Sequence, residues 1–382
     1  MAAIPFFKQA EINTPYLEAA IQAVMALGSG SSPMVLGQFS KQFEEEFADY
    51  LGCQRVSLVS NGLDALILSL QALGIGAGDE VIVPSHTYIA TWLAPLRLGC
   101  QLVACPVNES NLLMDEQQLA SLVTERTRCI MPVHLYGNAC DMQAILAIAK
   151  RVGSKVVEDA AQAHGARDQA DGQRVGCHGD AVAFSFYPTK NLGAMGECGG
   201  IATNNLDLDS SLRSWRNYGR RADDGSINQH PGVNGRADEI QAAFLSRKLK
   251  ALDHINNHRR TLVAAYAEGL NQVTSGLPLQ LIQYDEASAP HLAIVRCLNP
   301  SDRDPLIQYL RATAIDAAIH YRVPCQAQPC VQAATERVTI GQETQSQAQA
   351  IADSIMSLPM SECHSLDEVK QVIEAVHDYF TR

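Results

Sequence analysis

The stretch Ala181-Val-Ala-Phe-Ser-Phe-Tyr-Pro-Thr-Lys190-Asn-Leu-Gly-Ala-Met-Gly-Glu-Cys-Gly-Gly200 joins an apolar run to a lysine and a turn rich in glycine. The apolar run predicts a buried strand that ends before Pro188. Lys190 follows this strand directly. A lysine held where water is scarce has a lowered pKa, and its neutral amine is a nucleophile. The alternative is a lysine in a surface loop, which is the commoner place for this residue.

The composition is that of a large folded protein without an obvious nucleic-acid partner. The chain has 382 residues, of which 47% are hydrophobic and 18% are charged, so a large packed core and two or three domains are expected. A net charge of −12 argues against a nucleic-acid or anionic-membrane partner, although a local pocket for a phosphorylated ligand is compatible with it. We expect no transmembrane helix and no signal peptide, because long apolar runs and a basic leader are absent.

The cysteines and histidines do not form a metal motif. The eleven cysteines are scattered without a Cys-x-x-Cys pair, and the histidines lack the spacing of metal ligands. We therefore expect reduced thiols, a cytoplasmic location and no metal site.

Strand and helix patterns alternate from residue 55 onward. Two helices are expected before that point, and Phe39, Phe43 and Phe47 form one apolar stripe on the second of them. Asp115 and Asp141 are expected to cap two of the later helices. The alternation predicts an α/β fold with a mainly parallel sheet, whose ligands lie at the carboxyl ends of its strands. Strands are expected at residues 55–60, 79–84, 101–107, 129–135, 155–159 and 181–187.

The pattern changes after Arg236. Apolar positions from 240 to 255 predict one long helix that could link two domains. Strands are expected at 291–296 and 315–320, a helix at 303–312, and a last helix that begins at the capping box Ser365-Leu-Asp-Glu368. We therefore expect a large domain over residues 1–250 and a smaller α+β domain over residues 251–382.

Two strand ends carry features that suit a planar, phosphorylated ligand. The turn Ser60-Asn-Gly-Leu-Asp-Ala65 opens a helix, and the free amides of Gly62 and Leu63 would form an anion site. It is not a Walker A motif, and an ordinary strand-to-helix turn is the alternative. Tyr88 follows the next strand, where its ring could stack on a planar group or belong to the core.

Asp159 and Lys190 complete this set. Asp159 closes an apolar strand, and a buried carboxylate needs a partner such as a protonated ring nitrogen. The alternative is a carboxylate that caps the following helix. Lys190 follows Asp159 by about one crossover, so the two could lie at neighbouring strand ends. A phosphate turn, a stacking aromatic, a carboxylate and a lysine together fit pyridoxal 5′-phosphate.

Motifs spread over nearly the whole chain carry a family resemblance. They are Ile4–Phe7, Gly37–Glu44, Asn61–Leu66, Gly78–Pro84, Pro132–Gly137, Glu158–Gln162, Phe184–Gly193, Asn234–Ala243, His320–Tyr321 and Leu358–Met360. In these motifs the chain resembles the DegT/StrS family of sugar-nucleotide aminotransferases. The resemblance implies the aspartate aminotransferase fold, fold type I, with pyridoxal 5′-phosphate as cofactor.

The resemblance also implies roles for single residues around the cofactor ring. Lys190 matches the lysine that binds the cofactor covalently and acts in catalysis. Asp159 matches the partner of the pyridinium nitrogen, and Gln162 matches the residue on the side of the ring hydroxyl. Tyr88 matches the aromatic that stacks on the ring.

The phosphate and substrate ends follow in the same way. Gly62, Leu63 and Ser185 match the phosphate cup. Asn234 matches an asparagine that reaches the phosphate of the neighbouring subunit, which implies a homodimer with shared active sites. His320 and Tyr321 match a pair near the sugar pocket.

The resemblance finally implies a reaction, with some departures from the family pattern. Relatives often have Thr where this chain has Leu63, and the segment after Tyr321 lacks the usual Pro-x-His. Relatives that deoxygenate sugars have histidine at the lysine position, so Lys190 favours transamination. Pro84–Trp92 is most similar to members that act on dTDP-linked 3-keto-6-deoxyhexoses. We therefore expect amino transfer from L-glutamate to such a sugar nucleotide. The alternatives are a 4-keto substrate, a regulatory protein that binds the cofactor without turnover, and a scaffold without cofactor.

Overall fold

The computed structural model describes residues 3–31, 33–273 and 278–382. Its centre is an eight-stranded sheet in the order β1-β7-β6-β5-β4-β2-β3-β10. Neighbours from β6 to β10 are parallel, and β7 is antiparallel to both β1 and β6. The mainly parallel sheet of an α/β fold is confirmed. The strands are β1 (Arg55–Val59), β2 (Glu80–Pro84), β3 (Gln101–Cys105), β4 (Thr127–Ile130), β5 (Lys155–Asp159), β6 (Ala181–Ser185), β7 (Gly199–Thr203) and β10 (Val338–Thr339).

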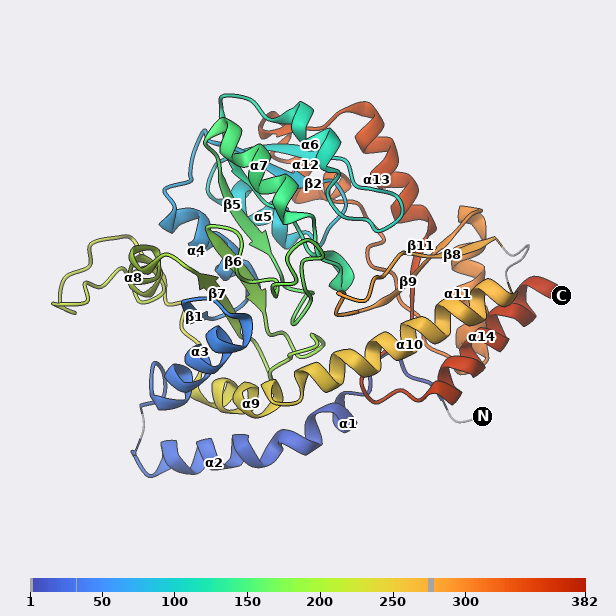
Figure 1. The fold of residues 1–382 in the computed structure, drawn as a ribbon, viewed down its shortest axis with the longest axis horizontal. Helices are drawn as coiled ribbons and strands as arrows, with labels where there is room; N and C mark the ends of the chain where they lie inside the picture. Colours follow the sequence, from blue (N-terminus) through green and yellow to red (C-terminus); the bar gives the residue numbers. More distant parts are fainter. Residues whose placement is uncertain (1–2, 32, 274–277) are drawn as a thin grey trace.

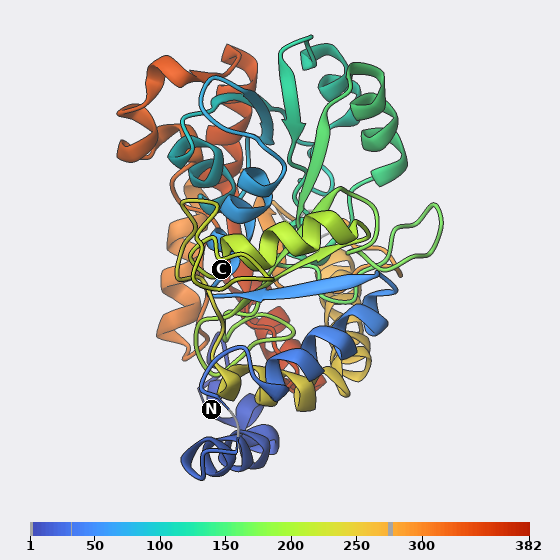
Figure 2. The same ribbon diagram turned by 90° about the vertical axis from the view of Figure 1, so that its left-hand side faces the viewer.

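Helices cover both faces of this sheet. Successive residues of a strand point to opposite faces, and in β6 Ala181 and Ala183 enter one core while Val182 and Phe184 enter the other. The first face carries α4 (Gly62–Ala72), α5 (Ala90–Arg97) and α8 (Leu206–Trp215), and the second carries α3 (Gln38–Leu51), α6 (Glu116–Leu122) and α7 (Met142–Val152). Figure 2 shows β1 between α3 and α8.

The local signals for the helices of this region are confirmed. Asp115 caps α6, where its carboxylate accepts the amides of Gln117 and Gln118. Asp141 caps α7 by accepting the amide of Ala144. Phe43 and Phe47 are fully buried in the core beneath α3. The strand expected at 129–135 is shorter than predicted, because β4 ends at Ile130 and a 3-10 turn, η2 (Leu135–Gly137), follows.

The single long helix predicted after Arg236 is wrong. The chain forms α9 (Glu239–Leu249) and α10 (Leu252–Val273), which are separated by a turn in which the amide of Ala251 bonds to the carbonyl of Lys248. Apolar periodicity reports which positions are buried, and it continues across a tight turn between two helices. Figure 1 shows α10 crossing the molecule beside α14 (Leu366–Thr381), with α2 (Leu17–Gly28) beside α9.

A second, three-stranded sheet follows in the C-terminal part of the chain. Its order is β11-β9-β8, and both pairs are antiparallel. Its strands are β8 (Leu279–Leu281), β9 (Ala293–Cys297) and β11 (Ile355–Leu358). The strand predicted at 315–320 is wrong: Ile315 pairs with Ile4 and Ala318 with Ser357, so the segment divides its bonds between two partners and forms no ladder.

The remaining helices complete this region. The predicted helix α11 (Arg303–Ala312) and the capping box between Ser365 and Glu368 at the start of α14 are confirmed. The other helices are α1 (Gln9–Asn13), α12 (Pro329–Gln332) and α13 (Gln342–Ser354). None of the helices in the described parts of the chain is both long and apolar enough to cross a membrane. The domain boundary at residue 250 stays a prediction.

Candidate functional site

The candidate site lies where four parallel strands end. Beyond β2, β4, β5 and β6 the chain carries polar and aromatic side chains instead of core residues. Because β5 and β6 are parallel neighbours, Asp159 and the segment that follows Ser185 lie at the same edge of the sheet. This edge brings together the predicted group of Gly62, Leu63, Tyr88, Asp159, Gln162, Ser185 and Lys190.

Asp159 is a buried carboxylate without a close cation. Its side chain accepts the hydroxyl of Thr91 at 2.8 Å and the amide of Ala161 at 3.2 Å. Burial raises the pKa of this carboxyl, although the two hydrogen bonds and the charge of Lys190 oppose the rise. In the described part of the chain, no lysine, arginine or histidine nitrogen lies within 4.0 Å of its oxygens. Such a carboxylate suits a cationic ligand group.

Lys190 lies in the turn after β6, where its amide donates to the carbonyl of Tyr187. The turn is tight at Gly193, since a Cβ there would lie 2.4 Å from the carbonyl oxygen of Pro188. Burial lowers the pKa of Lys190 to about 8, and the negative charge of Asp159 opposes the shift. The neutral amine is therefore accessible at a pH where an exposed lysine is fully protonated.

The start of α4 forms a cradle beside β6 and β7. Asn61 caps the helix by accepting the amide of Asp64, while the first amides of a helix, here those of Gly62 and Leu63, have no acceptor within it. A Cβ at Gly62 would lie 2.7 Å from the Cβ of Ser185. A side chain at position 62 would thus fill the space between the helix terminus and Ser185, where an anion would bind.

Tyr88 and Gln162 lie on the open side of this cradle. Tyr88 is 54% exposed, which rules out a core role, and its ring centre is 5.3 Å from that of Tyr321. The amide nitrogen of Gln162 donates to the hydroxyl of Tyr321 at 2.8 Å. His320 bonds through Nδ1 to the hydroxyl of Ser357 at 2.8 Å, and burial lowers its pKa to about 4. The predicted substrate pair therefore lies next to the predicted cofactor residues.

Asn234 does not lie with the other predicted site residues of its own chain. It is exposed, and its backbone pairs with Asn217, which lies two residues beyond the end of α8. Its role in the site of a neighbouring subunit stays a prediction.

Comparison with known proteins identifies the family. The DegT/DnrJ/EryC1/StrS aminotransferase family matches residues 17–377 of the chain. The chain belongs to this family. The dTDP-3-amino-3,6-dideoxy-alpha-D-galactopyranose transaminase of Aneurinibacillus thermoaerophilus is 42% identical over 378 residues, covering 98% of this chain and 99% of the relative. The dTDP-3-amino-3,4,6-trideoxy-alpha-D-glucose transaminase of Streptomyces venezuelae is 40% identical over 366 residues, covering 96% and 93%.

A solved structure of this family has the same fold. The crystal structure of S. venezuelae DesV in complex with a ketimine intermediate matches with a TM-score of 0.91 and 38% identity, and the match covers 100% of both chains. The fold is therefore that of the PLP-dependent aminotransferases, and the protein is an aminotransferase that uses pyridoxal 5′-phosphate.

The site fits the cofactor of the DegT/DnrJ/EryC1/StrS family. The cradle that a Cβ at Gly62 would fill suits the phosphate, and the exposed ring of Tyr88 suits a planar ring. Asp159, which lacks a close cation, suits a pyridinium nitrogen. The role of each of these residues stays a prediction.

The sequence did not single out every residue that this family member uses to shape the site. Thr91 donates to Asp159, so the hydroxyl of Thr87, 2.9 Å away, donates in turn to Thr91. The four-residue spacing of these threonines next to a strand end is the available signal. His86 and Tyr136, which bond to each other at 2.8 Å, also lie at strand ends.

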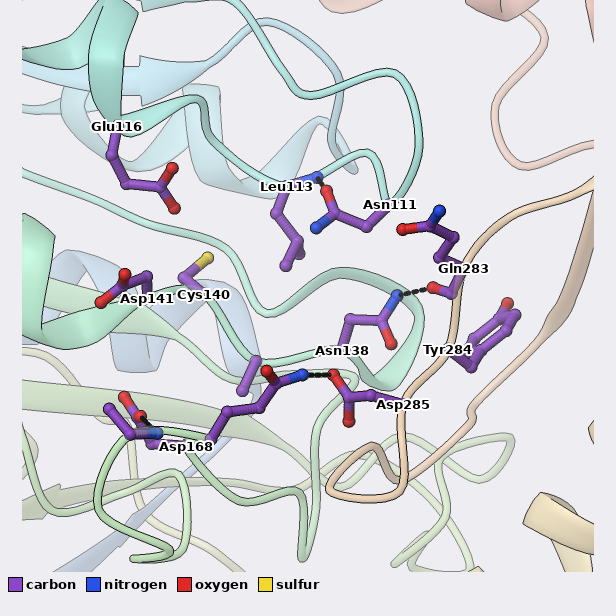
Figure 3. Close-up of a pocket in the computed structure, with 13 residues that line it drawn as sticks. Asn111, Leu113, Glu116, Asn138, Cys140, Asp141, Asp168, Gln283, Tyr284 and Asp285 are labelled. Carbon is purple, nitrogen blue, oxygen red and sulfur yellow. Dashed lines mark hydrogen bonds between the residues drawn. The ribbon is translucent and has the colours of Figure 1, made fainter.

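A cavity of about 690 Å³ lies elsewhere on the molecule and shares no residue with this group. Figure 3 shows its polar lining, in which the amide of Asn138 donates to the carbonyl of Gln283. Two of its carboxylates serve the backbone, since Asp141 accepts the amide of Ala144 as a helix cap and Asp168 accepts that of Ala170 in a turn. Because none of the predicted site residues lines this cavity, it is separate from the candidate active site.

Proposed function

We propose that this protein transfers the amino group of L-glutamate to the 3-keto group of a dTDP-linked 6-deoxy sugar. The observation that carries the proposal is the pair at the ends of β5 and β6. Asp159 is a buried carboxylate with no cation within 4.0 Å among the described residues, and Lys190, whose charge it senses, has a lowered pKa. The sugar class is supported by relatives at 42% and 40% identity that are named as dTDP-3-amino sugar transaminases.

The chain would supply binding, orientation and proton transfer. Pyridoxal 5′-phosphate, when bound, supplies an electron sink that stabilises the negative charge left on carbon after deprotonation. As a neutral amine, Lys190 would take the proton from the α-carbon of glutamate. It would then return this proton to the C4′ atom of the cofactor. Asp159 would keep the ring nitrogen protonated, and the amides of Gly62 and Leu63 would hold the phosphate. Tyr88 would cover the ring and limit the access of water.

Products formed from a panel of sugar nucleotides test this proposal. The purified enzyme would be incubated with cofactor, L-glutamate and dTDP-linked 3-keto or 4-keto sugars, with Lys190→Ala as the inactive control. We expect a mass corresponding to an amino sugar from the 3-keto substrates. Amination of the 4-keto sugars alone would show that the enzyme acts at carbon 4 of the sugar and not at carbon 3. A cofactor-loaded protein that converts no glutamate to 2-oxoglutarate would favour a regulatory protein that binds the cofactor without turnover.

We also propose that the protein works as a homodimer. Helix α2 carries an exposed apolar face that contains Ile21, Val24 and Met25, and Met34 is exposed nearby in the sequence. A second copy is the expected cover for such a face. Light scattering on Ile21→Glu/Met25→Glu should give a monomer, while the exposed Leu298→Glu control should leave a dimer. An unchanged dimer in the double variant would place the interface elsewhere.

Shared active sites can be tested by mixing two inactive variants. Lys190→Ala and Asn234→Ala chains, refolded or co-expressed together, would form heterodimers. If Asn234 serves the neighbouring site, one site of each heterodimer has both residues intact and activity returns. If it serves its own chain, both sites stay defective and the mixture remains inactive.

The cytoplasm is the location that we propose. All eleven cysteines are unpaired in the structure, and most of them are buried. Unpaired thiols in this number are typical of a reducing compartment.

A further inference from the structure

Tyr136 is a fully buried residue that the main chain holds in place. It lies in the turn η2 with a φ of 59°, between β4 and α7. Its carbonyl accepts the amide of His291 at 2.8 Å, and the carbonyl of Gly137 accepts the amide of Ala289 at 2.9 Å. A Cβ on Gly137 would lie 2.0 Å from the carbonyl oxygen of Ala289. The turn is thus packed tightly against residues 289–291, and this fixes where the Tyr136 side chain points.

The hydroxyl of Tyr136 lies between two groups from different parts of the chain. It is 2.8 Å from Nε2 of His86 and 2.5 Å from the carbonyl oxygen of His320. A carbonyl can only accept, so Tyr136 donates to His320, and Nε2 of His86 must donate to Tyr136. Burial lowers the pKa of His86 to about 3, which is consistent with a neutral imidazole that carries its one hydrogen on Nε2.

The backbone of Tyr136 starts a second path to the same peptide. Its amide donates to the side-chain oxygen of Gln162 at 2.9 Å, and the nitrogen of that side chain donates to the hydroxyl of Tyr321 at 2.8 Å. The hydrogen bonds and the His320–Tyr321 peptide bond therefore close a circuit of four residues: Tyr136, Gln162, Tyr321 and His320. The circuit holds this pair at two points, the main-chain carbonyl of His320 and the phenol hydroxyl of Tyr321.

We infer that Tyr136 is a positioning residue for the keto-sugar substrate, because its hydroxyl fixes the His320–Tyr321 peptide against Gln162. The inference rests on the proposed function in one respect, namely that His320 and Tyr321 face the sugar. Tyr136 touches neither cofactor nor substrate in this role. Its hydroxyl joins the strand ends of the large sheet to a segment that arrives from the C-terminal part of the chain. The reaction with glutamate needs Lys190 and Asp159 and does not depend on that link.

The variant Tyr136→Phe tests this role, because it removes the hydroxyl and keeps the ring and the backbone amide. Tyr266→Phe is a matched control, since Tyr266 is also fully buried and also donates to a main-chain carbonyl, that of Pro359 at 2.8 Å. Both variants would be loaded with cofactor and supplied with L-glutamate, and the loss of the visible band of the lysine-bound cofactor would be followed. The KM for the dTDP-linked 3-keto sugar would then be measured.

We expect Tyr136→Phe to raise the KM for the keto sugar about tenfold, since a hydrogen bond is lost and a buried carbonyl is left unpaired. The glutamate reaction should stay within about threefold of the unmodified enzyme, and Tyr266→Phe should change neither value by more than that. Equal losses in both half-reactions, or no difference between the variants, would overturn the inference. If Tyr136→Phe does not fold, His86→Phe removes the group that donates to the Tyr136 hydroxyl, and the same difference between the keto-sugar KM and the glutamate reaction is expected.

A measurement without substrate separates this inference from the proposed function. Amide hydrogen exchange in peptides that cover residues 318–323 should be faster in Tyr136→Phe than in Tyr266→Phe. If the unmodified enzyme aminates no keto sugar, the proposed function fails, and the exchange experiment alone decides whether Tyr136 positions this segment. Unchanged exchange in Tyr136→Phe would refute the positioning role even in an active enzyme.

Discussion

The protonation states of Lys190 and Asp159 are set by burial more than by each other. Burial lowers the pKa of the lysine to about 8 and raises that of the carboxyl. The charge of each residue opposes the shift of the other. The outcome is an amine that loses its proton near neutral pH, beside a carboxylate that gains stability when a cation binds near it.

The lysine pKa gives a pH dependence for cofactor attachment. Only the neutral amine attacks the aldehyde, so the rate of attachment to cofactor-free enzyme should rise with pH up to about 8 and then level off. The growth of the visible band after mixing, recorded between pH 6.5 and 9.5, measures this rate, and Lys190→Ala should give no band. A rate that still rises tenfold per pH unit above pH 9 would show that the lysine pKa is not lowered.

Replacement of Asp159 tests the second member of the pair. Asp159→Asn keeps the shape but removes the charge that would hold the ring nitrogen protonated. We expect the turnover rate to fall by about 10²- to 10⁴-fold, with an unchanged circular dichroism spectrum. Asp141→Asn, which keeps a capping side chain on a surface helix, should have normal activity. A near-normal rate for Asp159→Asn would exclude the proposed pairing with the cofactor.

The sequence was sufficient to identify site residues that directly follow a predicted strand. Lys190 and Asp159 each follow an apolar run, so their place at a strand end was predictable. Thr91 and Tyr136 could not be assigned in this way, because their partners Asp159, His86 and His320 come from other elements. The contact that gives each residue its role depends on the relative positions of those elements.

At the scale of elements, the start of α4 depends on the absence of a side chain at Gly62. A Cβ there would lie 2.7 Å from Ser185 and would push the helix terminus away from β6. We expect Gly62→Ala to raise the Kd for pyridoxal 5′-phosphate at least tenfold, measured by titration of the visible band. Gly28→Ala is the control, because no atom lies within 4 Å of the added Cβ at that position. Equal affinities in the two variants would show that the cradle is not the phosphate site.

There are physical reasons why some elements could not be predicted from the sequence. Strand β7 begins with Gly199 and Gly200, which have low strand propensity, and it is held by ladders to β1 and β6 on both sides. The segment 315–320 has a strand-like pattern but finds two different partners. Helices with local caps, such as α7 and α14, were predictable because a cap and its helix are neighbours in the chain.

At the scale of the whole molecule, buried histidines make the fold sensitive to acid. Burial lowers the pKa of His86 and His164 to about 3 and that of His320 to about 4. In the unfolded chain each titrates near its ordinary value of about 6.5, so below that pH the unfolded state binds more protons than the native state. Stability is therefore fully present above about pH 6.5 and falls as the pH drops toward 4. The raised pKa values of Asp159 and Glu116 act in the opposite direction, but they involve two groups against three histidines.

Urea unfolding of cofactor-free protein at several pH values checks this expectation. Each such histidine contributes up to about 1.4 kcal/mol per pH unit to the slope of the unfolding free energy. Burial between Phe184 and Phe186 outweighs a hydrogen bond with the backbone of Ser185, which acts to raise the pKa of His164. His164→Phe should therefore reduce the slope of the unfolding free energy against pH. Between pH 6 and 4.5 the reduction should correspond to about one proton taken up on unfolding. An unchanged slope would mean that His164 is protonated in the native state.

The antiparallel pairing of β1 with β7 has a consequence for the order in which the protein is made. β1 lies at the edge of the sheet, and among the described residues its one strand partner is β7, which ends at Thr203. The first strand of the sheet must therefore wait on the ribosome until more than half of the chain has been synthesised. Contacts between distant parts of a sequence form slowly and leave strand edges open to wrong partners in the meantime. The cradle at Gly62 is thus assembled late, after Ser185 and Gly199 have left the ribosomal tunnel.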